Sequence, residues 1–190
     1  MQVQSLLKKA AALDIKTNCP LHGPVLTENL GYYINLYDIW SSYKSETEGV
    51  FIAYTSVYGN TKEAATMLYD ILGKQNVKVS ISDLARSDMA ENIEDAFRYS
   101  KIVLATTTYN NDVFPFMKTF LDGLAERGFK NKKIGIIENG SWAPNAGKVI
   151  KSHFEKSQNI EFCENVVTIK SALTKENEET LVSLANELIK

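Results

Sequence analysis

The sequence predicts an α/β fold in which helices cover both faces of a five-stranded, doubly wound parallel sheet, with a helical extension before it. The first observation is an alternation: beyond residue 49, five short apolar runs are each followed by a segment with helical spacing. The second is that three of these runs are almost continuously apolar, which is typical of parallel strands buried on both faces. The third is length, because 190 residues suit one such domain and an appendage.

Composition and charge exclude several classes of protein. Hydrophobic residues make up 44% of the chain and charged residues 23%, which is ordinary for a globular protein. With 21 basic and 23 acidic residues the net charge is -2, so the chain offers no general field for nucleic acid or an anionic membrane. No apolar stretch approaches the roughly 20 residues of a membrane helix. Cys19 and Cys163 fit no CxxC or metal-finger spacing, so we expect a reduced, cytoplasmic protein.

Residues 1–47 form a separate region in this prediction, and residues 48–190 form the α/β domain. Apolar residues at helical spacing predict a short helix near Val3–Ala10 and an aromatic one near Tyr32–Tyr43. The six polar or small residues Lys44–Gly49 are typical of a linker. The first region is too small to form a core of its own.

The elements of the second region follow one another in order. The expected strands are Val50–Tyr54, Val77–Ile81, Ile102–Ala105, Ile134–Ile137 and Phe162–Ile169, and the expected helices cover residues 64–72, 89–98, 114–127, 145–157 and 174–189. The second strand alternates between polar and apolar residues and the fifth is interrupted at Glu164 and Asn165, so both suit the edges of the sheet. The strand order 2-1-3-4-5 fits this pattern, as do other orders with the same edges. In that order the chain reverses direction between strands 1 and 3, and ligands bind there, beyond the carboxyl ends of the strands.

The loop after the first strand has the composition of an anion-binding site. It leads directly into a helix and consists of Thr55, Ser56, Val57, Tyr58, Gly59, Asn60 and Thr61. Free N–H groups and the dipole at the start of a helix attract a negative group. The loop lacks the GxxxxGK[ST] pattern of nucleoside triphosphate sites and the GxGxxG pattern of dinucleotide sites, so a single phosphate is the better match. The alternative is that Ser56, Asn60 and Thr61 only cap the helix.

Two further loops are expected at the same edge of the sheet. The loop after the third strand contains Thr107, Thr108, Tyr109, Asn110 and Asn111, and the loop after the fourth contains Asn139, Gly140, Ser141 and Trp142. Tyr109 and Trp142 could stack on the two faces of a flat ring, with neighbouring amides and hydroxyls bonded to its polar edge. The alternative is that both aromatic residues simply cover the end of the sheet.

These motifs resemble those of the flavodiiron proteins (A-type flavoproteins), which join a metallo-β-lactamase-like di-iron domain to a flavodoxin domain. The run Thr55–Thr61 is similar to their phosphate loop, and Thr108–Asn111 and Gly140–Trp142 are similar to their second and third flavin loops. Cys19–Val25 resembles the end of the di-iron domain, and the aromatic helix resembles the segment that joins the two domains. The resemblance therefore spans nearly the whole chain.

The chain departs from the family pattern in one important respect. The H-x-E-x-D-H motif that carries the main iron ligands is absent, so no metal site is expected in this chain and His22 resembles an orphaned iron ligand of the intact protein. Thr107 stands where relatives commonly have proline, and Lys62 where they often have an acid; neither change should abolish flavin binding. The resemblance implies a flavodoxin-like domain that carries the tail of a di-iron domain.

The resemblance also implies a function in electron transfer. A domain of this kind binds FMN noncovalently, and the flavin carries the redox chemistry. The first loop would hold the phosphate, Thr107–Asn111 would contact the ring and ribityl chain, and Ser141 and Trp142 would close the other side. In intact relatives the FMN receives electrons from a rubredoxin or a flavin reductase and passes them to a di-iron centre that reduces O2 or NO, in head-to-tail homodimers. No catalytic residue is expected here, and the chain alone should not reduce O2 or NO.

Two other functions stay open at this point. A stand-alone NAD(P)H:quinone reductase is built on the same fold and would turn over with NAD(P)H. The other is a cofactor-free binding module such as a receiver, although Thr55 and Ser56 stand where a receiver has clustered acids.

Overall fold

The computed structural model describes residues 2–190 and divides after Glu46 into two compact units, each treated by itself below. The first unit contains helices α1 (Gln2–Ala10) and α2 (Leu30–Ser41), close to the two helices that the apolar spacing predicts. Neither helix has a buried side chain, which agrees with the expectation that this region forms no core of its own. The assignment of this unit as the tail of a di-iron domain stays a prediction.

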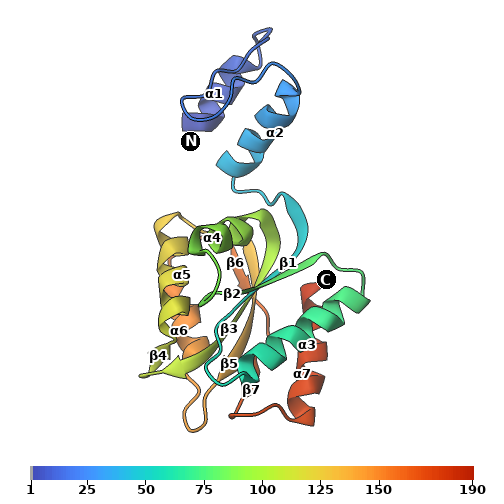
Figure 1. Ribbon diagram of the computed structural model, residues 1–190, viewed down its shortest axis with the longest axis vertical. Coiled ribbons are helices and arrows are strands. Elements are labelled where there is room, and N and C mark those ends of the chain that lie inside the picture. Colours follow the sequence, from blue (N-terminus) through green and yellow to red (C-terminus); the bar gives the residue numbers. More distant parts are fainter. Residues whose placement is uncertain (1) are drawn as a thin grey trace. The chain divides into compact units, whose positions relative to one another are not determined.

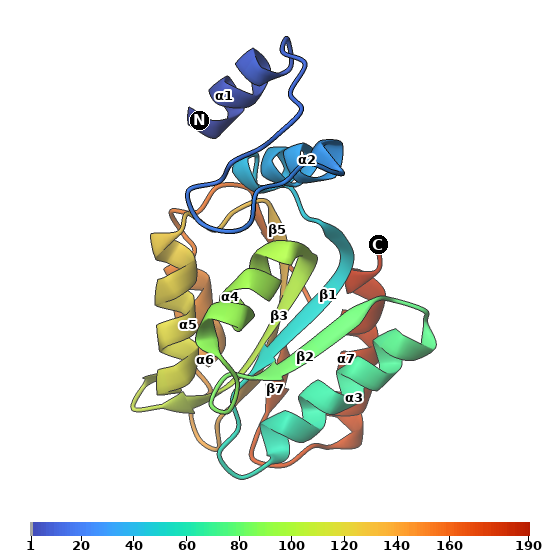
Figure 2. The same cartoon turned by 45° about the horizontal axis from the view of Figure 1, so that its top comes forward.

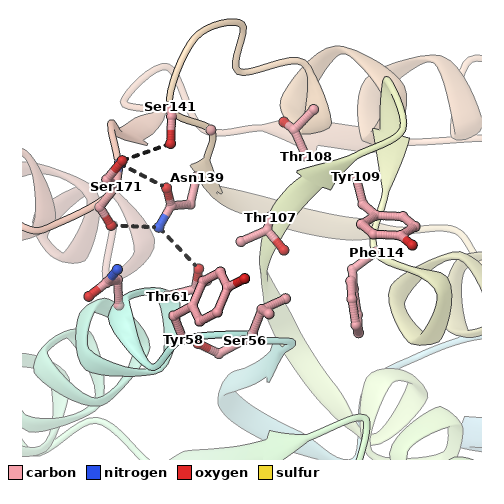
Figure 3. A pocket seen from close by; sticks show the side chains of 13 residues that line it. Ser56, Tyr58, Thr61, Thr107, Thr108, Tyr109, Phe114, Asn139, Ser141 and Ser171 are labelled. Carbon is pink, nitrogen blue, oxygen red and sulfur yellow. Dashed lines mark hydrogen bonds between the residues drawn. The ribbon is translucent and has the colours of Figure 1, made fainter.

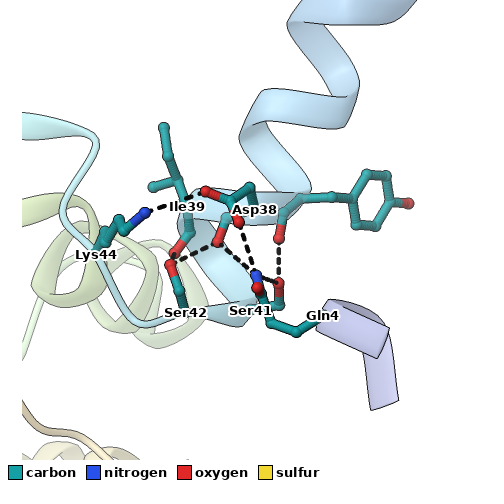
Figure 4. Close-up of polar contacts among 7 residues, drawn as sticks. Gln4, Asp38, Ile39, Ser41, Ser42 and Lys44 are labelled. Atoms are coloured by element: carbon teal, nitrogen blue, oxygen red, sulfur yellow. Dashed lines mark hydrogen bonds and ion pairs between the residues drawn. The ribbon is translucent and has the colours of Figure 1, made fainter. Parts of the chain in front are cut away.

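Polar contacts rather than a core join the two helices of the first unit. The side-chain amide of Gln4 donates to the Asp38 carboxylate over 2.9 Å and to the hydroxyl of Ser41 over 2.9 Å (Figure 4). The ammonium of Lys44 lies 3.2 Å from the other carboxylate oxygen of Asp38. These two neighbours hold the pKa of Asp38 below its usual value, the Gln4 hydrogen bond being the larger cause. The contacts fix α1 along α2, although no side chain of either helix is fully buried.

The second unit is a doubly wound sheet with helices on both faces (Figure 1). Its strands are β1 (Thr47–Tyr54), β2 (Val79–Asp83), β3 (Tyr99–Tyr109), β4 (Asp112–Val113), β5 (Lys132–Asn139), β6 (Ile160–Phe162) and β7 (Val167–Ile169). Its helices are α3 (Asn60–Lys74), α4 (Met89–Arg98), α5 (Pro115–Glu126), α6 (Ala146–His153) and α7 (Lys175–Leu188). The sheet order is β2-β1-β3-β5-β6, and Figure 2 shows β1 between β2 and β3. The fourth predicted strand corresponds to β5 and the fifth to β6 and β7, so the predicted order 2-1-3-4-5 is confirmed.

Each face of the sheet carries its own apolar core. On one face, Phe51, Leu104 and Phe120 belong to a buried cluster beneath α4, α5 and α6. On the other face, Ile52 and Leu184 belong to a second cluster beneath α3 and α7. Neighbouring residues of β1 serve opposite clusters because successive side chains of a strand point to opposite faces. This is why the first, third and fourth apolar runs of the sequence are continuous.

The fifth predicted strand is broken in two, at the position where polar residues interrupt it. β6 pairs with the first part of β5 and β7 with the last part. Between them, the main-chain N–H groups of Glu164 and Asn165 donate to the carboxylate of Glu187 on α7, over 2.7 and 3.1 Å. The side chain thus replaces the missing ladder bonds.

Two predictions about local structure are wrong. The linker predicted at Lys44–Gly49 ends earlier, because β1 already begins at Thr47. Gly49 is not a break: a Cβ there would collide with the main-chain oxygen of Lys78, so glycine allows the close approach at the start of β2. The second predicted loop is largely strand, since β3 continues to Tyr109 and turns back through β4. Asn110 and Asn111 have φ of 49° and 62°, the left-handed pair that a two-residue hairpin turn requires.

None of the helices within residues 2–190 combines the length and the apolar character that crossing a bilayer requires. Both cysteines are free thiols, Cys19 exposed and Cys163 buried.

Candidate functional site

A pocket of about 290 Å³ opens at the carboxyl ends of β1, β3 and β5, where the sequence predicts a ligand (Figure 3). It is lined by Ser56, Val57, Tyr58, Asn60, Thr61, Thr107, Thr108, Tyr109, Phe114, Asn139, Gly140, Ser141 and Ser171. None of these 13 residues carries a formal charge. The wall is made of hydroxyls, amides and aromatic rings, so any charged ligand would be held by neutral donors.

The start of α3 presents uncapped N–H groups to this pocket. Helix α3 begins after Gly59, whose φ of 98° is the left-handed conformation that glycine tolerates best. Within residues 2–190 no side chain caps this helix start. The hydroxyl of Ser56 instead accepts from the N–H of Gly59 over 3.1 Å, which tightens the loop. The N–H groups of the first turn therefore lack side-chain partners and are available to donate hydrogen bonds to an anion in the pocket. The alternative that these residues only cap the helix is wrong.

The carboxamide of Asn139, at the end of β5, joins three parts of the site. Its nitrogen donates to the hydroxyl of Thr61 over 3.4 Å and to the main-chain oxygen of Ser171 over 3.1 Å. Its oxygen accepts from the N–H of Ser171 over 3.2 Å. The side chain is only 6% exposed, so these bonds form in a place where water competes little. Asn139 thereby holds the start of α3 and the β7–α7 loop at a fixed distance.

The threonines at the end of β3 have different roles. The hydroxyls of Thr55 and Thr106 lie 2.7 Å apart in the interior and tie β1 to β3 beneath the pocket. Thr108 accepts from the N–H groups of Asn145 and Ala146, over 2.9 and 3.2 Å, and so fixes the start of α6. The hydroxyl of Thr107 is buried in the pocket wall without a partner among residues 2–190. An unsatisfied buried hydroxyl costs free energy and is typical of a site that a ligand completes.

Aromatic rings form the side of the pocket opposite the Asn139 carboxamide. Tyr109 and Phe114 pack edge to face, with ring centroids 5.6 Å apart and planes at 80° (Figure 3). Phe114 is not among the site residues predicted from the sequence. The signal was present, because Phe114 directly precedes the proline that begins α5 and lies where a hairpin from Tyr109 returns.

Eleven of the residues proposed from sequence line this pocket, and the others lie elsewhere. Thr55 lies beneath the floor, Gly59 supplies the backbone turn, and Asn110 and Asn111 form the hairpin turn. Trp142 is 96% exposed and does not line the pocket, so the structure does not bring it opposite Tyr109 as expected. Thr108 holds the end of the third loop against β3, and in this loop Ser141 rather than Trp142 lines the pocket. His22 is exposed, and residues 2–190 contain no group of three or more side chains suited to a metal ion.

Comparisons with known proteins agree with this geometry. The family model described as Flavodoxin matches residues 52–183, so the chain belongs to the flavodoxin family. A flavodoxin domain is an FMN-binding domain, and the predicted fold and cofactor are thereby confirmed.

The relatives found by sequence are larger redox proteins. The nitric oxide reductase of Moorella thermoacetica is 27% identical over 147 residues, which cover 77% of this chain and 36% of the relative. The anaerobic nitric oxide reductase flavorubredoxin of Enterobacter sp. (strain 638) is 27% identical over 127 residues, which cover 66% of this chain and 26% of the relative. The chain thus spans about a third or less of the length of these curated relatives.

Solved structures show the same fold. Rubredoxin oxygen:oxidoreductase from Desulfovibrio gigas has a TM-score of 0.88 at 17% identity, covering 98% of this chain and 47% of that one. The flavodiiron protein from Giardia intestinalis has a TM-score of 0.81 at 21% identity, covering 99% of this chain and 48% of that one. The predicted resemblance to flavodiiron proteins is confirmed.

Proposed function

We propose that this domain carries electrons through FMN held noncovalently in the pocket, as the flavin-binding part of a larger O2 or NO reductase of the flavodiiron type. The observation that carries the proposal is an uncharged pocket that connects the uncapped start of α3 to a pair of aromatic rings. FMN has matching parts: a phosphate, a chain of hydroxyls and a flat ring. When bound, it supplies the electron-transfer chemistry itself.

The phosphate end would lie against the first loop. Ser56, Asn60 and Thr61 offer a hydroxyl, an amide and a second hydroxyl beside the N–H groups of the first turn of α3. The helix dipole adds a partial positive charge there, which favours an anion without a lysine or arginine. Tyr58 is 92% exposed at the rim and can cover the loop from the solvent side.

The ribityl chain and the ring would occupy the rest of the pocket. Thr107 has the unsatisfied buried hydroxyl, and Asn139 and Ser141 add polar groups on the far wall. Tyr109 and Phe114 provide the apolar surface on which a flat ring packs. No lining residue is a nucleophile activated by a base, and electron transfer needs none.

The partners follow from the same proposal. A rubredoxin or a flavin reductase would supply electrons, and a di-iron domain of the intact protein would receive them, within a cytoplasmic homodimer. Exposed apolar side chains at the pocket rim, Val57 and Tyr58, suit the approach of another protein to within electron-transfer distance. The di-iron domain is needed for turnover, so the chain alone should not reduce O2 or NO.

The test is a visible absorbance spectrum of the purified chain, followed by titration of the apoprotein with FMN, FAD and riboflavin. A yellow protein that prefers FMN to riboflavin supports both the flavin and the phosphate contacts. A colourless protein that quenches none of the three would refute the proposal and favour a cofactor-free binding module. Steady-state turnover of NAD(P)H with a quinone would instead favour the stand-alone reductase.

A further inference from the structure

The loop between β7 and α7 adds a fourth wall to the pocket, beyond the three segments that follow β1, β3 and β5. Its contribution is Ser171, which lies on the side of Thr61 and opposite Tyr109 and Phe114 (Figure 3). Nothing in the sequence around Ser171 marks it as a binding residue, because it is an isolated serine in a short connection.

The backbone of Ser171 is held in an unfavourable conformation. Its φ is 76°, in the left-handed region where a side chain clashes with the main chain and where glycine or asparagine is the usual residue. Lys170 and Ala172 form an isolated antiparallel bridge on either side of it, so Ser171 forms the tip of a tight turn. A strained residue that the surroundings keep in place points to a use for its side chain.

The surroundings that keep it in place are those of the pocket itself. The carboxamide of Asn139 pairs with both the N–H and the C=O of Ser171, over 3.2 and 3.1 Å. The same carboxamide reaches Thr61 in the first turn of α3. The position of Ser171 is therefore defined relative to the helix start that the proposed phosphate faces.

The hydroxyl of Ser171 shares a hydrogen bond with a second hydroxyl of the pocket. Its oxygen lies 2.7 Å from the hydroxyl oxygen of Ser141, which also lines the pocket. Two hydroxyls carry two protons, and one hydrogen bond between them uses only one. When Ser141 donates the shared bond, the O–H of Ser171 remains available as a donor, and both side chains line the pocket.

We infer that the hydroxyl of Ser171 donates to the phosphate of FMN and that Ser171 helps the domain to distinguish FMN from riboflavin. The inference rests on the proposed function, since it presumes that FMN occupies the pocket. The phosphate is the relevant part of the ligand because Ser171 is linked through Asn139 to Thr61 and lies across the pocket from the aromatic rings.

Substitution of Ser171 by glycine separates a binding role from a structural one. Glycine removes the hydroxyl and also relieves the positive φ, so the melting temperature of the apoprotein should not fall. The FMN dissociation constant should rise about tenfold or more, the effect of losing a hydrogen bond to a charged group. Riboflavin affinity should stay unchanged. Ser171→Ala keeps the strain and should show the same loss for FMN alone.

Asn76 offers a matched control. It is exposed, has φ of 59° in the turn after α3, and does not line the pocket. Asn76→Gly therefore relieves a positive φ in the same way but outside the pocket, and the affinities for FMN and riboflavin should be unchanged.

The outcomes are distinguishable. FMN binding equal to wild type in both Ser171 variants would show that the hydroxyl is no ligand and overturn the inference alone. Equal losses for FMN and riboflavin would assign Ser171 to pocket shape or to the ribityl chain and would also overturn it. A wild-type protein that binds no FMN would overturn the proposed function and this inference with it.

Discussion

Replacing Thr61 by valine removes one hydroxyl from the proposed phosphate site and almost nothing else. Thr61 is 1% exposed in the first turn of α3, and valine keeps its branched shape in that tight space. The lost atom is the hydroxyl oxygen that accepts from Asn139 over 3.4 Å and that lines the pocket. The variant therefore tests one chemical group.

The two expected effects differ in size. A hydrogen bond to a charged group contributes roughly 1.5–3 kcal/mol, so the FMN dissociation constant should rise by about 10- to 150-fold. The bond from Asn139 is long, and Asn139 keeps its two bonds to Ser171, so the free energy of unfolding should fall by less than about 1 kcal/mol. Riboflavin lacks the phosphate and should bind as it does to the wild type.

The assay is the quenching of flavin fluorescence as apoprotein is added, with thermal unfolding of the apoprotein measured in parallel. Thr66 on the same helix is exposed and does not line this pocket, so Thr66→Val is the matched control and should change neither affinity. Unchanged FMN affinity in Thr61→Val would refute the placement of the phosphate beside Thr61. An equal loss of affinity for FMN and for riboflavin would show that the substitution deforms the pocket instead.

Three other predictions concern the ring side of the pocket and the interior. Tyr109→Ala should lower the affinities for FMN and for riboflavin by similar factors in the same titration, because both ligands contain the ring. A loss of affinity for FMN alone would contradict the placement of the ring against Tyr109. The buried ammonium of Lys132 donates to two main-chain carbonyls at the end of α4 and the start of β3, one over 2.7 Å. Lys132→Met should lower the free energy of unfolding by about 2 kcal/mol in a denaturant titration and leave FMN affinity unchanged, since Lys132 begins β5 and the pocket lies at its other end. Burial raises the pKa of Cys163 to about 12, so a thiol reagent should titrate only Cys19 until the protein is unfolded. Because an unfolded cysteine ionises near pH 8.5 by typical values, the stability of the wild type relative to Cys163→Ala should fall as pH rises above about 9. A constant difference would show that folding does not raise the pKa of this thiol.

Several features of this protein are determined locally and could be predicted from the sequence. A strand buried on both faces must be apolar throughout, so continuous runs such as Val50–Tyr54 identify the central strands and leave the interrupted ones for the edges. The order of the sheet then places the ligand at the ends of the central strands. The first loop was also predictable, because the tight turn and the helix start of Gly59 and Asn60 are consecutive in the chain.

The remaining walls of the pocket were decided by contacts between distant segments. Strand β3 continues through Thr106 and Thr107 by pairing with β5 and then to Tyr109 by pairing with β4, and this hairpin brings Phe114 to the pocket beside Tyr109. Trp142 is exposed in a loop whose end is held by Thr108, more than thirty residues earlier. Ser171 is held at the pocket by the carboxamide of Asn139, 32 residues before it in the chain. Apolar patterning records which residues are buried, whereas hydrogen bonds across such separations leave no periodic trace in the sequence, so only the tertiary structure decides them.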